Sequence, residues 1–396
     1  MANVSSSNGL EKRPKLRFPG FDKPWKVFKA EELFQNITDK NHPDETVLTI
    51  IQGKGTLPRE QAGRNIHYDD ASLSNYKKVE QGDFIIHLRS FEGGLEMANE
   101  AGIVSPAYTI LRCKRPHSSL FYDAYFHTDE FINHNLSKSV EGIRDGRQIS
   151  YEAFKWLGIP YCEPTEQEKI SNLFAALNER IAKQRDLIEA LKKYKRGVMR
   201  AIFRDKSFVF SKATVWKSIR LGDECVFFSG GTPKSTDSSY YGGSIPFIRS
   251  GEIHGEKTGL FLTEAGLQNS SAKMVSKGDL LIALYGATSG EVDISKIDGA
   301  INQAILCIRP YDMNKQYLRY LLEDSKDDII NTYLQGGQGN LSAEIIKNLR
   351  VDMPDSTAQS SVVEFLSMIE RRIEMSIAEH EQIQAMKRSS LQQLFI

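Results

Sequence analysis

The sequence has few cysteines, and none of them lies near another. The four, Cys113, Cys162, Cys225 and Cys307, form no CxxC pair, so neither a zinc ribbon nor a disulfide scaffold is indicated. Free thiols in a reducing cytoplasm are the simpler expectation. Apolar runs such as DLLIAL are far shorter than the ~20 residues of a membrane helix, and the polar start MANVSSSNGLEKRPK lacks a signal-peptide core. We therefore expect a cytoplasmic protein without a membrane segment.

An excess of one charge is also missing. The 51 Lys and Arg residues balance the 51 Asp and Glu residues, so a general basic affinity for nucleic acid is not indicated, although a local patch is still allowed. Hydrophobic residues at 40% and charged residues at 26% are typical of a globular protein. A length of 396 residues predicts two or three domains.

Catalytic and metal-binding motifs are missing as well. The chain has no P-loop, no GxSxG elbow and no Asn- or Asp-Pro-Pro-aromatic methyltransferase box. His127 and His134 stand in HTDEFINH, which is not an HExxH zinc motif. Pro43-Asp44 followed by Gln52-Gly53-Lys54 loosely resembles a metal-dependent nuclease site, but a turn before the strand TVLTII explains it more simply. We expect no catalytic and no metal site on this chain.

What the chain does contain is a long helical segment, EKISNLFAALNERIAKQRDLIEALKKYKRGVMRAIF, from Glu168 to Phe203. Its apolar residues recur at alternating steps of four and three, which is the seam of a coiled coil. Gln184 and Lys195 are the polar members of the series. The apolar members are Ile170, Phe174, Leu177, Ile181, Ile188, Leu191, Val198 and Ile202.

The seam occurs twice in the chain. Adding 192 to each residue number maps Ile170 onto Val362 and Phe203 onto Phe395, and the second copy SVVEFLSMIERRIEMSIAEHEQIQAMKRSSLQQLF needs no gap. At the same offset ISYEAFKWLGIP corresponds to LSAEIIKNLRVDMP, and at an offset of 196 VEQGDFIIHL parallels VSKGDLLIAL. The ordered matches predict two halves, each a globular unit followed by a long helix.

The local patterns extend this prediction to the fold. Apolar runs after Gly-Asp turns indicate short strands, and QYLRYLLEDSKDDIINTYL has helical periodicity. A narrow seam suits a helix partner, so we expect antiparallel pairing with Gln184, Ser376 and His380 setting the register; the alternative is that each helix packs on its own globular unit. The predicted fold is α+β, two mixed α/β domains joined by two long antiparallel coiled-coil helices with a pseudo-two-fold repeat. The expected boundaries are 1–162 and 204–354 for the globular domains, and 163–203 and 355–396 for the helices.

Three segments of the second half resemble a known family. GGTPKSTDSSYYGGSIPFIRSGEI, GDLLIALYGATSGEVDISKIDGAINQAI and QGGQGNLSAEIIKNLRVDMP resemble the target-recognition domain of type I restriction–modification specificity subunits. The opening PKLRFPGFDKPW and the helix entry CEPTEQEKI are similar to the same family. The first half departs from the motif, since LRSFEGGLEM stands where LYGATSGEV stands later.

The resemblance implies a non-catalytic subunit whose two globular domains each read one half of a bipartite double-stranded DNA target. It implies that the helices act as a spacer and dock two methyltransferase subunits, joined by a restriction (translocase/endonuclease) subunit. S-adenosylmethionine, ATP and magnesium then belong to those partners, and this chain binds no cofactor. Two other functions stay open from the residues alone: a coiled-coil adaptor without DNA specificity, and a metal-dependent nuclease that uses the Asp44 region.

In the second globular domain, the expected DNA contacts lie in loops that combine cations, hydroxyls, amides and tyrosines. Asn302 and Gln303 are candidates to read adenine, or else an amide pair that joins two loops. Gln338 and Asn340 are contacts or simple turn residues. The complete set is Thr232, Lys234, Tyr240, Tyr241, Arg249, Ser250, Tyr285, Thr288, Asn302, Gln303, Gln338 and Asn340.

In the first globular domain, the expected contacts are cations that would face phosphates. Each of them alone is better explained by a solvated charge or a salt bridge, whereas the set together indicates a phosphate-facing surface. The complete set is Lys54, Arg59, Arg64, Arg89, Arg144 and Arg147.

Overall fold

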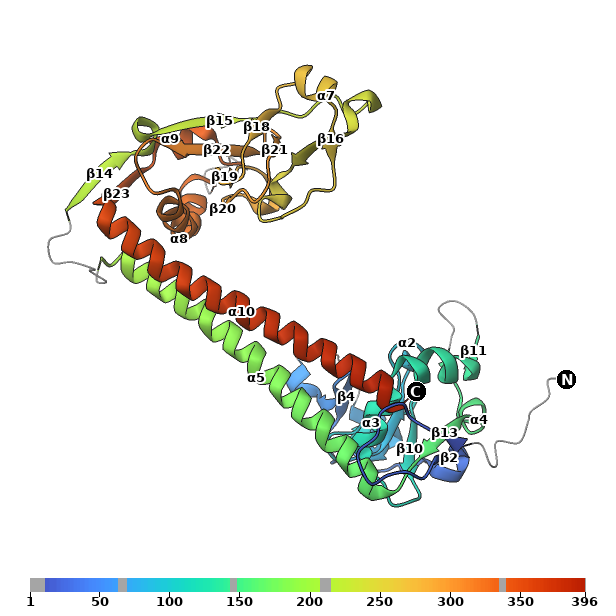
Figure 1. Ribbon diagram of the computed structural model, residues 1–396. Coiled ribbons are helices and arrows are strands. Elements are labelled where there is room, and N and C mark those ends of the chain that lie inside the picture. The colour runs from blue at the N-terminus through green and yellow to red at the C-terminus, as the bar shows by residue number, and fades with distance from the viewer. Residues whose placement is uncertain (1–10, 63–69, 143–147, 207–214, 335–339, 396) are drawn as a thin grey trace. The chain divides into compact units, whose positions relative to one another are not determined.

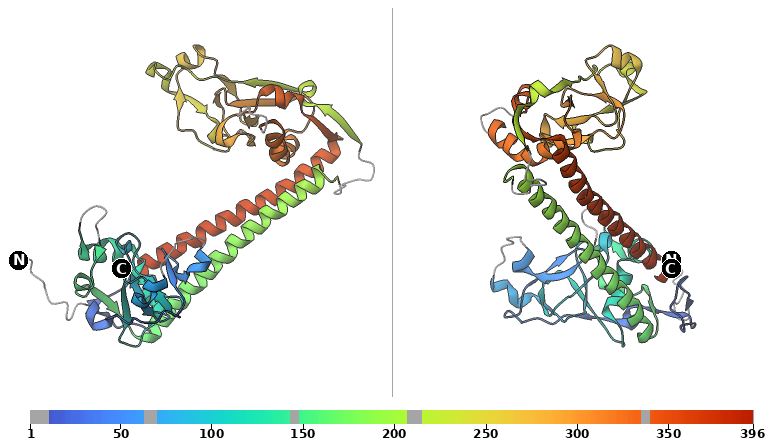
Figure 2. Two further views of the ribbon diagram at one scale, coloured as in Figure 1. Left: turned by 180° about the vertical axis from the view of Figure 1, so that it is seen from behind. Right: turned by 60° about the vertical axis from the view of Figure 1, so that its left-hand side comes forward.

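The structure is a computed structural model of the chain (Figures 1 and 2), in which residues 11–62, 70–142, 148–206, 215–334 and 340–395 are described. Contacts divide the chain into unit 1, Met1–Arg185 with Ala378–Ile396, and unit 2, Asp186–Ile377. Each unit holds one globular head and one segment of each long helix, α5 (Pro164–Phe203) and α10 (Ser356–Phe395). Both helices begin and end within one residue of the predicted bounds, while the division into four domains stays a prediction.

The head of unit 1 consists of short strands in small sheets. A four-stranded sheet has the order β3-β10-β7-β8, a three-stranded sheet the order β1-β2-β13, and three strand pairs are β4–β5, β6–β9 and β11–β12. The strands are β1 (Glu11–Lys12), β2 (Trp25–Lys29), β3 (Phe34–Ile37), β4 (Leu48–Ile51), β5 (Gly55–Pro58), β6 (Lys77–Val79), β7 (Phe84–Ile86), β8 (Glu96–Met97), β9 (Gly102–Val104), β10 (Thr109–Cys113), β11 (Val140–Glu141), β12 (Gln148–Ile149) and β13 (Gly158–Tyr161). The helical segments are α1 (Ala30–Leu33), η1 (Arg59–Ala62), η2 (Asp70–Asn75), α2 (Ser90–Gly93), α3 (Ser119–Phe126), η3 (Glu130–Asn135), η4 (Leu136–Ser139) and α4 (Tyr151–Phe154).

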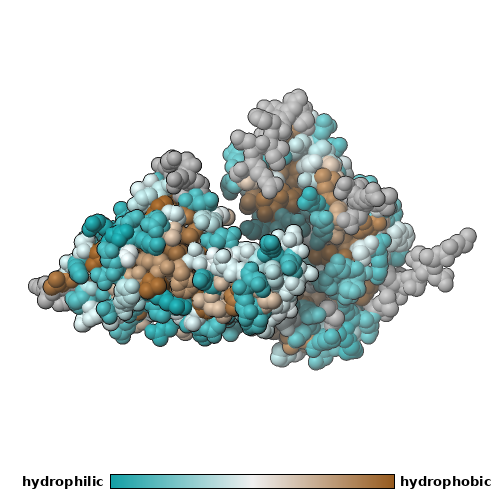
Figure 3. Space-filling view, turned by 90° about the horizontal axis from the view of Figure 1, so that it is seen from above, coloured by the Kyte–Doolittle hydropathy of each residue, from teal (hydrophilic) through white to brown (hydrophobic). Residues whose placement is uncertain are grey.

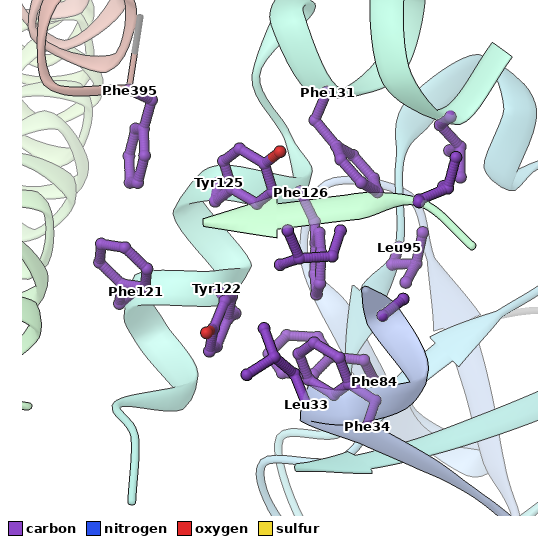
Figure 4. Packing of buried hydrophobic residues seen from close by; sticks show 14 of the residues in the cluster. Leu33, Phe34, Phe84, Leu95, Phe121, Tyr122, Tyr125, Phe126, Phe131 and Phe395 are labelled. Atoms are coloured by element: carbon purple, nitrogen blue, oxygen red, sulfur yellow. The ribbon is translucent and has the colours of Figure 1, made fainter. Parts of the chain in front are cut away.

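Aromatic side chains fill the core of unit 1. Helix α3 contributes Phe121, Tyr122, Tyr125 and Phe126, all of which are buried. Figure 4 shows Phe395, at the end of α10, beside two of them; its ring centroid lies 5.2 Å from that of Phe121 and 5.6 Å from that of Tyr125. Such tilted aromatic pairs contribute about 0.5–1.5 kcal/mol each beyond the burial of their surface. The last turn of α10 is therefore part of the core of this head.

The head of unit 2 also consists of short strands in small sheets. Its sheets have the orders β14-β23, β15-β22-β19-β20 and β17-β16-β21-β18. The strands are β14 (Trp216–Arg220), β15 (Cys225–Ser229), β16 (Tyr241–Ile248), β17 (Phe261–Leu262), β18 (Lys273–Val275), β19 (Leu280–Ala283), β20 (Val292–Ile294), β21 (Gly299–Ile301), β22 (Ile305–Pro310) and β23 (Arg350–Pro354). The helical segments are α6 (Leu221–Glu224), η6 (Ser238–Tyr240), η7 (Ser250–Glu252), α7 (Glu264–Gln268), η8 (Gly286–Thr288), α8 (Lys315–Leu334) and α9 (Ala343–Asn348).

Two buried glutamines show that the repeat extends to single hydrogen bonds. In unit 1, Gln167 Nε2 donates to the carbonyl of Cys162 at 2.9 Å, and its Oε1 accepts from the N–H of Ser118 at 2.9 Å. In unit 2, Gln359 Nε2 donates to the carbonyl of Pro354 at 2.9 Å, and its Oε1 accepts from the backbone N–H just before α8 at 3.0 Å. Each glutamine thus fastens the start of a long helix to its own head.

The Gly-Asp turns before β7 and β19 are equivalent in the same way. Asp83 accepts hydrogen bonds from Arg112 at 2.8 and 2.7 Å, and Asp279 accepts them from Arg309 at 3.1 and 2.6 Å. In each pair the arginine lies on the antiparallel neighbour of the strand that follows the turn. The two matching four-stranded sheets, β3-β10-β7-β8 and β15-β22-β19-β20, confirm the predicted internal repeat.

The two long helices run side by side in opposite directions within unit 1. Ile170, Phe174 and Leu177, near the start of α5, share one core with Ile383 and Leu394 near the end of α10. The ring of Phe174 stacks on that of Phe395, with centroids 6.2 Å apart. The seam positions are therefore buried by the partner helix, as the narrow apolar stripe predicts.

In unit 2 the other ends of the same helices pack together. Val198 and Ile202, near the end of α5, share a core with Val362, Leu366 and Ile369 near the start of α10. The antiparallel pairing and the α+β fold predicted from the sequence are confirmed. Helix α8, predicted from its periodicity, belongs to the same core.

Polar residues interrupt the seam at the predicted positions. Gln184 is 8% exposed, and its Nε2 donates to Glu379 Oε2 at 3.3 Å. Ser376 is 2% exposed, and His380 Nε2 lies 3.0 Å from Gln384 Nε2 on its own helix. The bond between Gln184 and Glu379 joins α5 to α10 and accords with a role in setting their register.

Candidate nucleic-acid interface

One end of the β17-β16-β21-β18 sheet in unit 2 gathers several of the predicted contacts. Strands β16 and β21 run parallel, with Ile248 opposite Ile301. The carboxyl ends of parallel neighbours point the same way, so the residues that follow each strand come out side by side. Arg249–Ser250 follow β16 and Asn302–Gln303 follow β21. Four of the predicted residues therefore meet at this edge.

A close approach of two backbones adds a fifth residue. A Cβ atom on Gly230 would lie only 1.7 Å from the carbonyl oxygen of Ile301, so only glycine allows the loop after β15 to pass there. This loop brings Thr232 to Gln303, and the Thr232 hydroxyl donates to Gln303 Oε1 at 2.7 Å. Both residues are exposed. Nothing in their sequence spacing indicates this contact, because 71 residues separate them.

Arg249 is held at the edge by a carboxylate. Its Nε and Nη2 atoms lie 3.1 Å from the two carboxylate oxygens of Glu252. Burial favours the protonated form of Glu252, but hydrogen bonds from Arg249 and from the N–H of Gly259 lower its pKa to about 2. Because the guanidinium is about half exposed, it can exchange this partner for a phosphate or a base edge. Glu252 orients Arg249, and it is not among the residues predicted from the sequence.

Three more predicted residues lie next to the same edge. The N–H of Leu284 donates at 2.8 Å to the carbonyl of the residue after Gln303, and the N–H of Leu341 donates to the carbonyl of Leu284 at 3.0 Å. Tyr285 and Asn340 are therefore on neighbouring segments. Helix η8, which includes Thr288, contacts η7.

The remaining described contacts of this head lie toward the start of β16. The hydroxyl of Tyr241 donates to the carbonyl of Pro233 at 2.8 Å, and the carbonyl of Tyr240 accepts from the N–H of Thr263 at 3.0 Å. Lys234 is exposed in the loop that Tyr241 fixes. These residues lie in or next to the loop after β15 that carries Thr232, and not at the sheet edge formed by the ends of β16 and β21.

The predicted cations of the first head are spread over different elements. Lys54 is exposed in the turn between β4 and β5, and Arg89 is exposed just before α2. The guanidinium of Arg59, in η1, lies 5.9 Å from the ring centroid of Tyr76. Four predicted residues lie outside the described residues: Arg64, Arg144, Arg147 and, in the second head, Gln338.

A buried carboxylate shapes the turn that carries Lys54. Glu96 is 0% exposed and accepts hydrogen bonds from the N–H groups of Gly53 at 2.6 Å and Gly55 at 2.8 Å. His127 Nε2 lies 3.3 Å from the same carboxylate. Burial alone would raise the pKa of Glu96, but the hydrogen bonds from His127 and Gly53 lower it. His127 is thus a partly buried partner of Glu96.

The described residues contain no group of three or more His, Cys, Asp and Glu side chains that could hold a metal ion. Asp44, the acid of the nuclease-like sequence, lies in a turn. In the same described part of the chain, no helix is both long and apolar enough to cross a bilayer.

Comparison with known proteins finds a family model that matches most of the second half. Residues 214–385 match the family described as type I restriction modification DNA specificity domain. The chain is 25% identical to the type I restriction enzyme MjaX specificity subunit of Methanocaldococcus jannaschii over 258 residues, which are 61% of this chain and 59% of that protein. It is 23% identical to the MjaVIII specificity subunit of the same organism over 332 residues, which are 78% of this chain and 77% of that subunit. The match thus spans less than two thirds of the MjaX subunit.

Solved structures share the fold over almost the whole chain. The type I restriction–modification S subunit from M. genitalium has a TM-score of 0.58 at 16% identity, covering 97% of this chain and 99% of that one. The HsdS subunit from Thermoanaerobacter tengcongensis has a TM-score of 0.51 at 18% identity, covering 96% and 97%.

Proposed function

We propose that this chain, which belongs to the type I restriction–modification specificity subunits, is the DNA-reading component of its complex. Each head recognises one half of a bipartite double-stranded target, and the chain itself carries no catalytic residue. S-adenosylmethionine, ATP and magnesium bind to partner subunits. Beyond family membership, we propose that each head reads one target half, that the long helices set the spacer, and that their outer surface docks the partner subunits.

One observation carries the proposal: the scaffold of the two heads repeats individual hydrogen bonds, whereas their exposed loops differ. The Gln167 and Gln359 clamps and the Asp83 and Asp279 turns are equivalent in detail. In contrast, the edge around Gln303 displays amides, hydroxyls and an arginine, while the described candidates of the first head are Lys54 and two arginines on separate elements. Two copies of one frame with different loops are suited to reading two different sequences.

The long helices suit the role of spacer. Each has 40 residues, which corresponds to roughly 60 Å at ~1.5 Å per residue. One helical turn of DNA is about 34 Å long, so a helix of this length can serve heads that bind successive turns. Pairing of α5 with α10 in both units stiffens the segment that joins them.

The outer surface of the helices supports docking of two methyltransferase subunits and, through them, the restriction subunit. Large apolar side chains stay exposed on both helices, including Tyr194 on α5 and Met368, Met375 and Met386 on α10. On the face drawn in Figure 3, hydrophobic patches lie between larger hydrophilic areas. Methionine is common at protein-binding surfaces because its side chain is flexible and polarisable.

The test is the methylation pattern of the complex assembled from this chain and the other subunits of its system. We expect methylation at one bipartite motif with a fixed unread spacer. Inserting one heptad, about 10 Å of helix, into both long helices should lengthen that spacer. Methylation without a bipartite motif would favour an adaptor without DNA specificity.

The nuclease alternative has a separate test. The purified chain should not cleave DNA in magnesium, and Asp44→Asn should leave both methylation and restriction by the complex unchanged. Cleavage by the chain alone, lost in Asp44→Asn, would contradict the proposed role.

A further inference from the structure

Gln303 is an exposed glutamine whose amide is fixed by another side chain. The Thr232 hydroxyl donates to Gln303 Oε1 at 2.7 Å. The residue before it is also used for support, since Asn302 Oδ1 accepts from the N–H of Ala304 at 3.1 Å and closes the turn after β21. Gly230 permits the loop to come this close. Both the backbone and the amide plane of Gln303 are therefore set before any ligand binds.

This contact decides the hydrogen-bonding character of Gln303. A glutamine amide has one oxygen with two acceptor lone pairs and one NH₂ group that donates. Thr232 uses one of these lone pairs, and in the described part of the chain no residue accepts a hydrogen bond from Gln303 Nε2. The side chain thus presents donors to solvent, although its chemistry includes both functions.

Base edges in the major groove distinguish a glutamine whose oxygen is free from a glutamine whose oxygen already accepts a hydrogen bond. A free glutamine reads adenine by accepting from N6 and donating to N7, whereas guanine presents two neighbouring acceptors, O6 and N7. A glutamine whose oxygen already accepts from Thr232 keeps its donors free for guanine, and its oxygen is a poorer acceptor for adenine N6. Resting on the proposed function, we propose that Gln303 reads a guanine in one half of the target and that Thr232 is the positioning residue that favours guanine over adenine there. For Gln303, this proposal replaces the sequence-based hypothesis of an adenine reader.

The first experiment compares motifs methylated by complexes that contain the wild-type chain, Thr232→Val or Thr236→Val. Valine keeps the shape of threonine but frees Gln303 Oε1, so Thr232→Val should accept adenine at one guanine position. We expect the preference for guanine over adenine there to fall roughly 10-fold, within the range of a good base contact. Thr236, exposed in the same loop, is the matched control and should leave the motif unchanged.

The second variant, Gln303→Glu, replaces the donors by acceptors. It should reject guanine and favour cytosine, whose N4 donates, at the same position. Binding to oligonucleotides with each of the four base pairs at that position measures the preference even if methylation is slow. Equal weakening for all four base pairs would show that Gln303 is not a base reader.

Other outcomes are equally decisive. A motif changed by Gln303→Glu but not by Thr232→Val would overturn the assigned polarity, and a motif unchanged in both would overturn the whole inference. Neither result touches the proposed function, which is tested separately by whether the wild-type complex methylates a bipartite motif.

Discussion

The junction between head and long helices is built on equivalent positions in the two units but is held by different charges. In unit 2, a cavity of about 650 Å³ at this junction is lined by Lys195, Arg319, Glu323 and Glu370, among others. In unit 1, a cavity of about 530 Å³ is lined by Lys387, Asp123, His127 and Asn178, among others. The helix residues correspond at an offset of 192 and the head residues at an offset of 196.

In unit 2 the junction is a closed ion network. Lys195 Nζ lies 2.7 Å from both Glu323 and Glu370, and Arg319 Nη2 lies 2.6 Å from Glu370. The hydroxyl of Tyr320 donates to Glu370 at 2.6 Å. Burial alone would raise the pKa of Glu370, but the charges of Arg319 and Lys195 lower it. Lys195 thus ties α5 to both α8 and α10.

In unit 1 the same cavity has no such network. Asn178 stands at the position equivalent to Glu370. Among the described residues, no carboxylate lies within salt-bridge distance of Lys387. Burial lowers the pKa of Lys387 and raises that of Asp123. His127 joins this cavity to the buried Glu96. The comparison teaches that the glutamine clamps and the apolar seam are kept in both copies, while the charges at the junction change with the head.

The largest expected effect comes from replacing Glu370 of unit 2 by asparagine, the residue at the equivalent position 178 of unit 1. Glu370→Asn leaves Lys195 and Arg319 facing each other with less compensating charge, which should lower the free energy of unfolding by about 3 kcal/mol. The reverse change, Asn178→Glu, places a carboxylate near Lys387 and should change it by less than about 1 kcal/mol. Urea unfolding of both variants checks this, and equal effects would contradict the difference between the junctions.

A second pair of substitutions tests what the two units share. Gln167→Ala and Gln359→Ala each remove two hydrogen bonds and leave buried backbone groups without partners, so each should cost about 2 kcal/mol. Hydrogen exchange at the start of α5 and of α10 locates the loss in the matching unit. A large cost at only one of the two positions would break the equivalence of the clamps.

Replacing the two repeat-equivalent lysines, Lys195 and Lys387, by methionine should give a smaller difference in the free energy of unfolding than the preceding substitutions. Lys195→Met removes two ion pairs but leaves Glu370 bonded to Arg319 and Tyr320, so we expect a loss of about 1 kcal/mol. Lys387→Met removes a cation that burial disfavours and should be neutral or slightly stabilising. Thermal unfolding at one pH measures both, and a greater loss for Lys387→Met would reverse the comparison.

The smallest expected effect is a pH dependence specific to unit 1. Burial disfavours the charged form of His127, but its hydrogen bond to Glu96 and the charge of Asp123 raise its pKa above the ordinary value. A raised histidine pKa stabilises the fold below the unfolded pKa of about 6.5, and this contribution is lost as pH rises through the folded pKa.

The advantage of the wild type over His127→Gln should therefore shrink between pH 6 and pH 8.5. Burial lowers the pKa of His87, which gives that residue the opposite trend, but His87 is present in both proteins. An advantage that stays constant or grows over this range would contradict the assignment.

Much of the fold follows from the sequence because the repeat marks equivalent elements. The offset of 192 locates both helices, and the Gly-Asp turns locate β7 and β19. The same offset relates Gln167 to Gln359, so the repeat itself could have predicted the two glutamine clamps. Helical periodicity could not, because it reports apolar positions alone.

The site was less predictable, because its contacts depend on which distant loops meet. Arg249 and Glu252 are three residues apart, a spacing from which their ion pair was foreseeable. Thr232 and Gln303 are joined only because Gly230 lets two backbones touch, and Glu96 supports the turn of Lys54 across more than 40 residues. For the described residues, the sequence places the candidate contacts of the second head in loops, but it does not show the hydrogen bonds that orient their side chains.

The central claim is that each head reads one half of the target independently on a shared frame. The most direct measurement is the methylated motif of a complex in which residues 1–162 are exchanged for the first head of another specificity subunit. Because Asp123 and His127 line the junction beside Lys387, the exchanged head has to fold against foreign helix residues. The account predicts that one half of the motif changes while the other half and the spacer stay the same. A change in both halves, or in neither, would contradict it.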